Sequence, residues 1–304
     1  MSGALWAVVA GVGFGVFQSL NRRAVSGMDV YLATFLQLLV SALVLAAISL
    51  LTVDVSLVSR APMEALISFA LAGFIHFFIG WTFLNISQQR IGAARTSPLI
   101  GTTPLFAAVI AAVTLRESLN AVSLLGIVLI VAGVYVVSNR SGPSSATGVV
   151  AHGPVAGANL WRASLFGLSA ALCWAISPIF TRQGLEGLSS PLLGVTIGMT
   201  ASAAAYGLPL MVRRKQQGAL PASTDALLFK IAAGVLVGLS TWARWVALDL
   251  APVAPVLALT LVSVPVVILL SPIVSGKHQE PVTVALWAGA ALIVGGALML
   301  ISFG

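Results

Sequence analysis

The stretch VYLATFLQLLVSALVLAAISLLTV, which covers residues 30–53, decides the fold class of this protein. It contains no charged residue and consists mostly of Leu, Ala, Val and other apolar residues. A helix that crosses the hydrocarbon core of a bilayer, which is about 30 Å thick, needs about 20 mostly apolar residues. The stretch therefore predicts one membrane-spanning helix.

Nine similar apolar runs lie along the rest of the chain. Together the ten runs cover residues 4–20, 30–53, 65–86, 93–115, 121–138, 163–180, 191–212, 226–248, 253–275 and 282–303. The composition agrees, because 59% of the 304 residues are hydrophobic and 8% are charged, against about 25% charged in soluble domains. Membrane β-barrels instead alternate apolar and polar residues over short segments. We therefore predict an all-α polytopic membrane protein with ten transmembrane helices.

Other protein classes fit the sequence poorly. The first run has no basic residue before it and is followed by Arg22 and Arg23, which predicts a retained helix and not a cleaved secretory signal. The net charge of +7 comes from basic residues scattered through short connections, as expected of topology determinants and not of a nucleic-acid surface. The single Cys173 allows no internal disulfide and no cysteine-based metal site. We expect an integral protein of the bacterial cytoplasmic (inner) membrane, with the lipid bilayer as partner, no nucleic acid, no metal and no cofactor.

The two halves of the chain resemble each other. The only long connection, residues 139–161, separates a first five-helix repeat at residues 1–138 from a second at residues 162–304. Residues 5–32 align with residues 165–192 at an offset of 160, and the offset then grows to 161 and to 163. The matched pairs are Arg22 with Arg182, Gly27 with Gly187, Trp81 with Trp242, Pro104 with Pro265, Glu117 with Glu280, Gly126 with Gly289, and Gly133 with Gly296. Because five spans is an odd number, we predict that the repeats are inverted relative to each other in the membrane.

The basic residues predict the orientation of the chain. Eleven of the 15 lysine and arginine residues lie in the connections that follow the odd-numbered runs, with Lys230 counted beside the cluster Arg213-Arg214-Lys215. The other four are Arg60, Arg116, Arg182 and Arg244. Basic residues favour cytoplasmic connections. This distribution predicts that both termini lie outside and that residues 213–215 are cytoplasmic.

A repeated pattern in the fourth and fifth runs, and again in the ninth and tenth, carries a family resemblance. The stretch SPLIGTTPLF at residues 97–106 contains two prolines, and LTLVSVPV at residues 259–266 contains one. LRESL at residues 115–119 follows the first of them, and the glycine-containing stretches GIVLIVAG at residues 126–133 and GAALIVGG at residues 289–296 complete the pattern. The chain resembles the EamA branch of the drug/metabolite transporter superfamily over nearly its whole length.

The resemblance implies export or uptake of small metabolites, with amino acids and their derivatives as the expected substrates. Two features depart from the family. Relatives usually place their basic cluster between the second and third helices and keep both termini cytosolic, whereas here the cluster at residues 213–215 follows the seventh run. The first run has Phe14, Gly15 and Gln18 where the related small multidrug exporters carry a membrane-embedded Glu, so proton-driven drug exchange loses its usual residue.

Polar and aromatic residues inside the runs are candidates for binding substrate, because a polar group in hydrocarbon is costly unless it faces a cavity or a partner. In the first run, Phe14, Gln18 and Asn21 share one helical face, and Trp174 and Thr181 occupy the aligned positions of the sixth run. Gln18 and Thr181 could instead form ordinary hydrogen bonds between helices.

The third and eighth runs offer a second group of candidates. Trp81 and Asn85 follow one another at helical spacing, and Arg244 lies between Trp242 and Trp245. An arginine beside two indole rings can bind a carboxylate while the rings cover the rest of a ligand. The alternatives are an interfacial aromatic belt, a snorkelling Arg244, or its neutralisation by Asp249. We expect Trp81 and Trp242 to face a shared central cavity from opposite repeats.

The predicted site combines these residues with three further groups. His76 is the only histidine in a predicted span, Gln37 is a polar residue of the second run, and Pro104 and Pro265 are candidate hinges. The expected substrate-binding residues are Gln18, Gln37, His76, Trp81, Asn85, Trp174, Trp242 and Arg244. No span carries a catalytic group with its partner, so an enzyme is not expected.

We therefore predict a carrier that exports amino acids or related small molecules by alternating access. The alternatives are a proton-coupled drug/metabolite antiporter and, more remotely, a channel or a membrane scaffold that does not transport. No sequence pattern indicates the oligomeric state.

Overall fold

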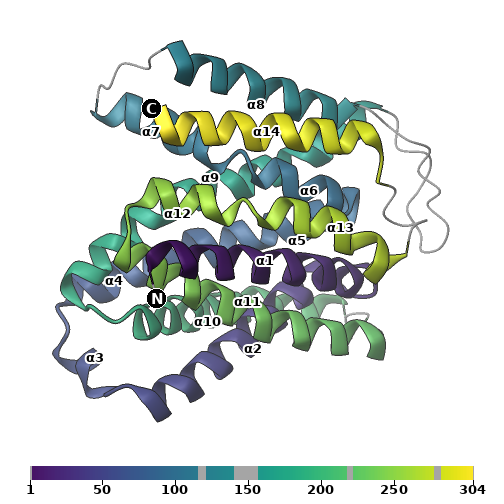
Figure 1. The fold of residues 1–304 in the computed structure, drawn as a ribbon. Coiled ribbons are helices and arrows are strands. Elements are labelled where there is room, and N and C mark those ends of the chain that lie inside the picture. Colours follow the sequence, from purple (N-terminus) through teal and green to yellow (C-terminus); the bar gives the residue numbers. More distant parts are fainter. Residues whose placement is uncertain (1, 116–120, 140–156, 218–221, 277–281, 304) are drawn as a thin grey trace.

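The computed structural model describes residues 2–115, 121–139, 157–217, 222–276 and 282–303. Every regular element within these ranges is a helix, which confirms the predicted all-α class (Figure 1). The central linker at residues 140–156 and the two turn residues Glu117 and Glu280 lie outside the described residues.

The helices follow the predicted runs closely. The first half contains α1 (Gly3–Ser26), α2 (Val30–Thr52), α3 (Ser56–Arg60), α4 (Met63–Gly73), the π-helix η1 (Phe74–Gly80), α5 (Trp81–Ile91), α6 (Ala93–Ile100), α7 (Thr103–Leu115) and α8 (Ala121–Asn139). The second half contains α9 (Gly157–Gly187), α10 (Pro191–Gln217), α11 (Thr224–Leu250), α12 (Val253–Thr260), α13 (Ser263–Ser275) and α14 (Val284–Phe303).

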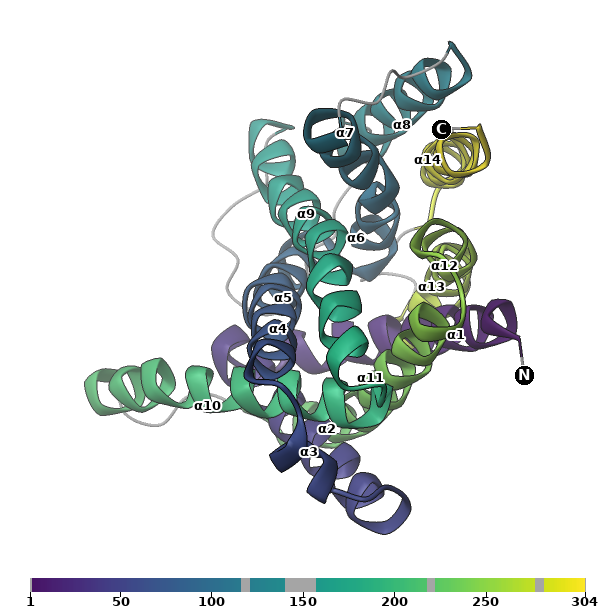
Figure 2. The ribbon, with the colours of Figure 1, turned by 90° about the vertical axis from the view of Figure 1, so that its left-hand side faces the viewer.

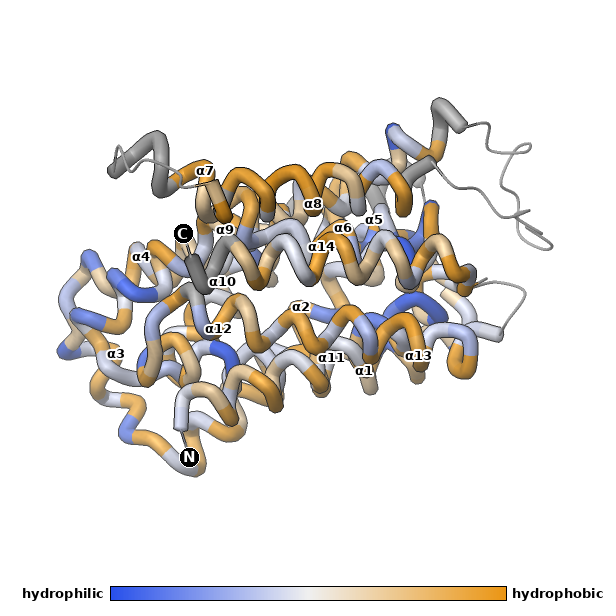
Figure 3. Tube along the Cα trace, turned by 45° about the horizontal axis from the view of Figure 1, so that its top comes forward, coloured by the Kyte–Doolittle hydropathy of each residue, from blue (hydrophilic) through white to orange (hydrophobic). Residues whose placement is uncertain are grey.

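Seven helical segments of the described chain are long and apolar enough to cross a membrane. They are Gly3–Ser26, Val30–Thr52, Met63–Ile91, Leu160–Gly187, Pro191–Val212, Thr224–Leu250 and Pro255–Ser275. Two shorter apolar helices, Leu124–Val137 and Val284–Met299, lie within α8 and α14. The predicted run at residues 93–115 is divided between α6 and α7. Hydrophobic residues extend along the helices, and many hydrophilic ones gather towards the two ends of the bundle (Figure 3), as in a polytopic membrane protein.

Polar side chains and glycines fix several helix ends. The Asp29 carboxylate accepts hydrogen bonds from the backbone N–H groups of Tyr31 and Leu32, each at 3.0 Å, and so begins α2. The Ser223 hydroxyl accepts the N–H of Ala226 at 3.2 Å and begins α11 in the same way. These bonds satisfy N–H groups that lack a partner inside the helix. Gly92 lies between α5 and α6 and has a φ of 85°. Residues with a side chain rarely adopt this conformation, so the turn between the two helices requires a glycine.

The fourth and ninth runs are broken helices and not simply curved ones. α6 ends at Ile100 and α7 begins at Thr103, while α12 ends at Thr260 and α13 begins at Ser263. A proline ring clashes with the carbonyl four residues earlier and removes one N–H donor. For Pro104 that carbonyl belongs to Ile100, which instead accepts a 2.7 Å hydrogen bond from the Thr103 hydroxyl.

Pro265 acts in the same way on the carbonyl of Leu261. That carbonyl accepts the N–H of Val264 at 2.9 Å in place of a regular helical bond. Both predicted hinge prolines therefore lie directly after a break in a membrane helix.

The contacts between the halves form matching sets. α1 packs along α11 and also against α12 and α13, while α9 packs along α4, η1 and α5 and also against α6 and α7. α2 contacts α10, and α8 contacts α14. Figure 2 shows α7, α8 and α14 together at one edge of the bundle, with α2, α3 and α10 at the opposite edge. The ends of α1 and α14 that carry the two termini lie at the same end of the bundle (Figure 1).

The glycines of the family pattern explain the close contact of α8 with α14. A Cβ atom on Gly133 would lie 2.7 Å from the carbonyl oxygen of Gly289, and one on Gly296 would lie 2.5 Å from that of Gly126. A side chain at either position would force the helix backbones apart. The two glycines of one half thus meet the two glycines of the other in antiparallel order.

Small residues elsewhere also pack closely against neighbouring helices. A Cβ on Gly15 would lie 3.1 Å from the Ser263 carbonyl oxygen, and one on Gly238 would lie 3.3 Å from the Ser41 Cα. A Cβ on Gly198 would lie 2.9 Å from the carbonyl oxygen of Phe69 and 3.3 Å from the Cα of Gly73. Gly198 and Gly73 let α10 and α4 approach with their backbones nearly in contact.

We expect Gly198→Ala to lower the free energy of unfolding by about 1–3 kcal/mol, because the added methyl group overpacks a backbone contact. Gly207→Ala on the same helix is the matched control. Its nearest neighbour would be Phe35 Cε2 at 3.8 Å, so the better helix propensity of alanine should leave stability unchanged or raise it by up to about 1 kcal/mol. Unfolding of both purified variants in detergent measures the difference, and equal stabilities would show that the α4–α10 contact tolerates a methyl group.

Candidate substrate cavity

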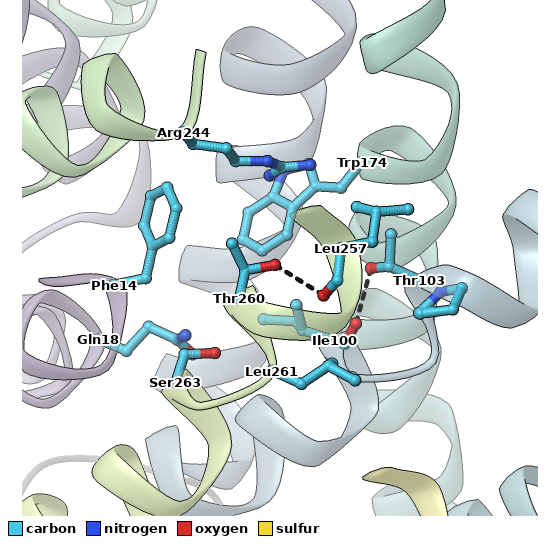
Figure 4. Close-up of a pocket in the computed structure, with 12 residues that line it drawn as sticks. Phe14, Gln18, Ile100, Thr103, Trp174, Arg244, Leu257, Thr260, Leu261 and Ser263 are labelled. Carbon is cyan, nitrogen blue, oxygen red and sulfur yellow. Dashed lines mark hydrogen bonds between the residues drawn. The ribbon is translucent and has the colours of Figure 1, made fainter. Parts of the chain in front are cut away.

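A cavity lies where the two broken helices meet α1, α9 and α11. Its lining consists of Phe14, Gln18, Ile100, Gly101, Thr103, Pro104, Trp174, Arg244, Leu257, Thr260, Leu261 and Ser263 (Figure 4). Both breaks contribute, since the residues on either side of each break belong to the lining. The cavity volume is about 40 Å³, whereas sites for small molecules usually measure about 300–1,000 Å³. A metabolite could enter only if the surrounding helices moved.

Arg244 brings a positive charge to this cavity. Its side chain is 5% exposed, and its Nε is buried without a hydrogen-bond partner. No salt bridge or hydrogen bond joins the guanidinium to another residue of the described chain, and Asp249 is exposed. Arg244 and Trp174 both line this cavity (Figure 4). A buried guanidinium without an anion is costly, so the geometry favours a ligand that brings a carboxylate or another anionic group.

The breaks place two helix starts at the same cavity. Thr103 is the first residue of α7 and Ser263 is the first residue of α13, and both line the cavity. The N–H groups of Leu105 and Val264 already donate to the carbonyl oxygens of Thr102 and Leu261, each at 2.9 Å. The two helix starts therefore contribute mainly the partial positive charge of their helix dipoles, which has the same sign as Arg244.

Trp174 forms the aromatic wall, and His76 supports it from behind. The two rings stack at 5.1 Å between centroids with an interplanar angle of 11°. Trp174 Nε1 donates to the His76 carbonyl oxygen at 3.3 Å, and His76 Nδ1 lies 2.7 Å from Ser177 Oγ. His76 belongs to η1, whose wider turn interrupts the third span. His76 is not part of the lining, so its direct contribution is to hold the Trp174 ring.

The two tryptophans that were expected to share the central cavity lie outside its lining. Trp81 is 1% exposed and packs between Phe77, at 4.9 Å, and Phe17, at 6.3 Å. Trp242 lies 6.2 Å from Trp6. Their exposure to substrate in another conformation stays a prediction.

Trp245 is also buried, inside the helix bundle. It stacks on Phe69 at 5.6 Å and on Phe77 at 6.4 Å. The third and eighth spans therefore contribute an aromatic core, while Arg244 alone from this group reaches the cavity.

Gln37 and Asn85 belong to a second polar group that the sequence did not reveal. Lys230, whose side chain is 0% exposed, donates to Gln37 Oε1 at 2.6 Å and to Asn21 Oδ1. Asn21 donates in turn to Asn85 Oδ1 at 2.7 Å. Lys230 was counted as a loop residue in the predicted topology, which is wrong, because it lies within α11. The sequence feature that could have indicated this group is a lysine within the apolar run at residues 226–248.

The fold and the cavity together define a polytopic membrane protein with a charged internal site. Residues 1–139 match the EamA-like transporter family. This match confirms the predicted family over the first half of the chain, and it indicates a membrane transporter of the drug/metabolite superfamily.

Solved structures and curated sequences give a complementary result. One crystal structure has 17% sequence identity to the chain, covers 99% of both chains and has a TM-score of 0.65. At this identity the similarity shows the fold alone, but it extends over both halves. No curated protein sequence gave a significant match.

Proposed function

We propose that this protein is an alternating-access carrier of small metabolites that bear a carboxylate, with amino acids and related compounds as its substrates. The observation that carries the proposal is the buried Arg244 in the wall of the cavity, with no anionic partner among the described residues. Trp174 and Phe14 offer apolar surface to the rest of such a molecule. Gln18 and Ser263 add groups that can hydrogen-bond an amine or a hydroxyl.

Two inverted five-helix repeats are the architecture that we propose for this carrier. The matching contact sets support it, because α1 packs on α11 as α9 packs on the segment from α4 to α5. The two broken helices also correspond, since α7 and α13 begin 160 residues apart, at Thr103 and Ser263. Transporters of this design bind substrate between the repeats and expose the site to one side at a time.

A carrier explains the small cavity better than a channel does. A channel needs a continuous polar path, whereas about 40 Å³ holds only a few water molecules. We propose export from the cytoplasm across a bacterial inner membrane as the direction and the location, on the basis of the family's expected role.

Transport in proteoliposomes tests this function. Vesicles that contain the purified protein and unlabelled amino acid should take up labelled amino acid by exchange, and the rate should saturate with concentration. An imposed pH gradient shows whether protons are coupled to transport. Flux that does not saturate and shows no exchange would indicate a channel, and no flux for any carboxylate substrate would contradict the proposal.

We expect both termini to lie outside and the connection between α10 and α11 to be cytoplasmic. Ten of the basic residues still favour this orientation after Lys230 is assigned to the interior of α11. Reporter fusions at Gly304 and within residues 216–222 measure it. A cytoplasmic signal at Gly304 would reverse the orientation and leave the fold as it is.

A further inference from the structure

Lys230 is the centre of a buried cluster that joins four helices. It donates from α11 to Gln37 of α2, at 2.6 Å, and to Asn21 of α1. Asn21 donates to Asn85 Oδ1 and to Gln88 Oε1 of α5, each at 2.7 Å. Asn85 also donates to the Thr34 hydroxyl of α2 at 2.8 Å. We call the residues Asn21, Thr34, Gln37, Asn85, Gln88 and Lys230 the amide cluster; all six are fully buried.

The cluster holds a lysine without a carboxylate. Both acceptors of the Lys230 amine are neutral amide oxygens, and no ion pair of the described chain includes it. An ammonium has three donors, of which two are used here. Gln37 Nε2 is also buried without a partner. Unsatisfied buried donors cost free energy, and hydration would remove that cost. Access of water to the cluster would therefore stabilise the Lys230 amine and the Gln37 amide.

The members of the amide cluster lie near one end of the bundle. Asn21 is near the end of α1 (Gly3–Ser26) and Gln88 is near the end of α5 (Trp81–Ile91), while Lys230 is near the start of α11 (Thr224–Leu250). Their hydrogen bonds hold the end of α5 against α1 and α2. An opening between α5 and these helices at that end would break the cluster.

The fold itself does not demand a lysine at this position. In the predicted alignment of the halves, Lys230 corresponds to Phe69 at an offset of 161. Phe69 stacks on Trp245 at 5.6 Å and has no polar role. One half thus fills the position with an aromatic ring, and the other fills it with an amine inside a set of amides.

A hydrogen bond connects the amide cluster to the cavity. Gln88 Nε2 donates to Gln18 Oε1 at 3.4 Å, and Gln18 lines the cavity. A substrate that drew the Gln18 side chain towards itself would remove a partner from Gln88. Occupation of the cavity can therefore change the stability of the cluster without contacting Lys230.

We propose that the amide cluster is the gate on the side of the membrane where α1 ends, and that Gln18 couples this gate to substrate in the cavity. The coupling to substrate rests on the proposed transport function, whereas the gate itself does not. In this structure the gate is closed, with Lys230 held between Asn21 and Gln37. During opening, α5 separates from α1 and α2 and water hydrates the amine.

Spin labels at Arg90 of α5 and Leu228 of α11 measure the opening. Both side chains are exposed and neither belongs to the amide cluster. The labelled protein, in a Cys173→Ala background and in lipid nanodiscs without substrate, should give mainly one short distance. Asn21→Leu removes an acceptor of the buried amine and should shift the ratio of open to closed protein by about tenfold or more.

A second substitution makes the test specific for the charge. Lys230→Met combined with Asn21→Leu should restore part of the short-distance population, because no buried amine is left without its acceptor, although the bonds from Asn21 to Asn85 and Gln88 stay lost. Thr181→Val is the matched control, since Thr181 aligns with Asn21 and its hydroxyl donates only within its own helix, to the Ser177 carbonyl oxygen. It should leave the distance unchanged.

The outcomes separate the gate from the transport function. An unchanged distance in folded Asn21→Leu protein, or no restoration in the double variant, would overturn the gate. If Asn21→Leu does not fold, Gln37→Glu decides, because it places a carboxylate beside Lys230 and removes only an Nε2 group that has no partner. It should sharpen the short distance, and a broader distribution would overturn the proposal. These distances are measured without substrate, so a failure to transport amino acids leaves their interpretation intact.

Discussion

Arg244→Gln is expected to weaken the binding of a carboxylate substrate by about 10- to 100-fold. A hydrogen bond to a charged group contributes about 1.5–3 kcal/mol, and about 1.4 kcal/mol corresponds to a tenfold change in affinity. Glutamine keeps a polar side chain at the cavity wall but removes the charge. The folded fraction should be retained, because Arg244 is buried without an anionic partner among the described residues.

Binding of labelled amino acid to purified protein measures the effect. Arg182→Gln is the matched control, because Arg182 is exposed and donates to the carbonyl oxygens of Leu248 and Ala251, away from the cavity. An amine that lacks the carboxylate should bind to Arg244→Gln at least as tightly as to the wild type, because the substitution removes a like charge from the cavity wall. Equal affinity of the amino acid for both proteins would remove Arg244 from the site.

Pro104→Ala combined with Pro265→Ala should slow transport by about 10- to 100-fold with little loss of substrate binding. Alanine restores an N–H donor and removes the clash with the preceding turn, which is worth up to about 3 kcal/mol per proline to a continuous helix. The two breaks line the cavity, and continuous helices would stiffen its walls. Each single variant should have an intermediate rate.

The exchange rate in proteoliposomes, compared with binding affinity in detergent, separates motion from recognition. Pro191→Ala is the matched control, because Pro191 is the first residue of α10, where a proline is compatible with a regular helix. A double variant that exchanges substrate at the wild-type rate would show that the breaks are static features of the walls.

Much of the fold was predictable from sequence because the bilayer imposes a simple rule. An apolar run of about 20 residues must be helical, since no water is present to satisfy backbone groups. The predicted run at residues 30–53 corresponds to α2, Val30–Thr52. The positions of Pro104 and Pro265 were visible as well. The sequence did not show that the helix breaks just before each proline, because the break depends on other hydrogen-bond donors for the carbonyls of Ile100 and Leu261.

The candidate site was predictable only in part. Gln18, Trp174 and Arg244 reach one cavity, as their residue types suggested. Trp81 and Trp242 do not reach the cavity and pack against other aromatic rings instead. A tryptophan ring suits core packing as well as ligand contact, and the way its helix is rotated within the bundle determines which of the two it makes. Gln37 and Asn85 are polar residues in spans, yet their partner is Lys230, 193 residues from Gln37 in the chain.

The sequence by itself determined the helical class, the approximate ends of the spans and the family of the first half, because these depend on local hydropathy and on residue order. Only the tertiary structure decided which polar groups meet. Arg244 is left without an anion at the cavity wall, whereas Lys230 is enclosed by amides from α1 and α2. The reason is physical: the cost of burying a charge depends on the partners that other helices bring to it, and those partners are set by packing across the whole bundle.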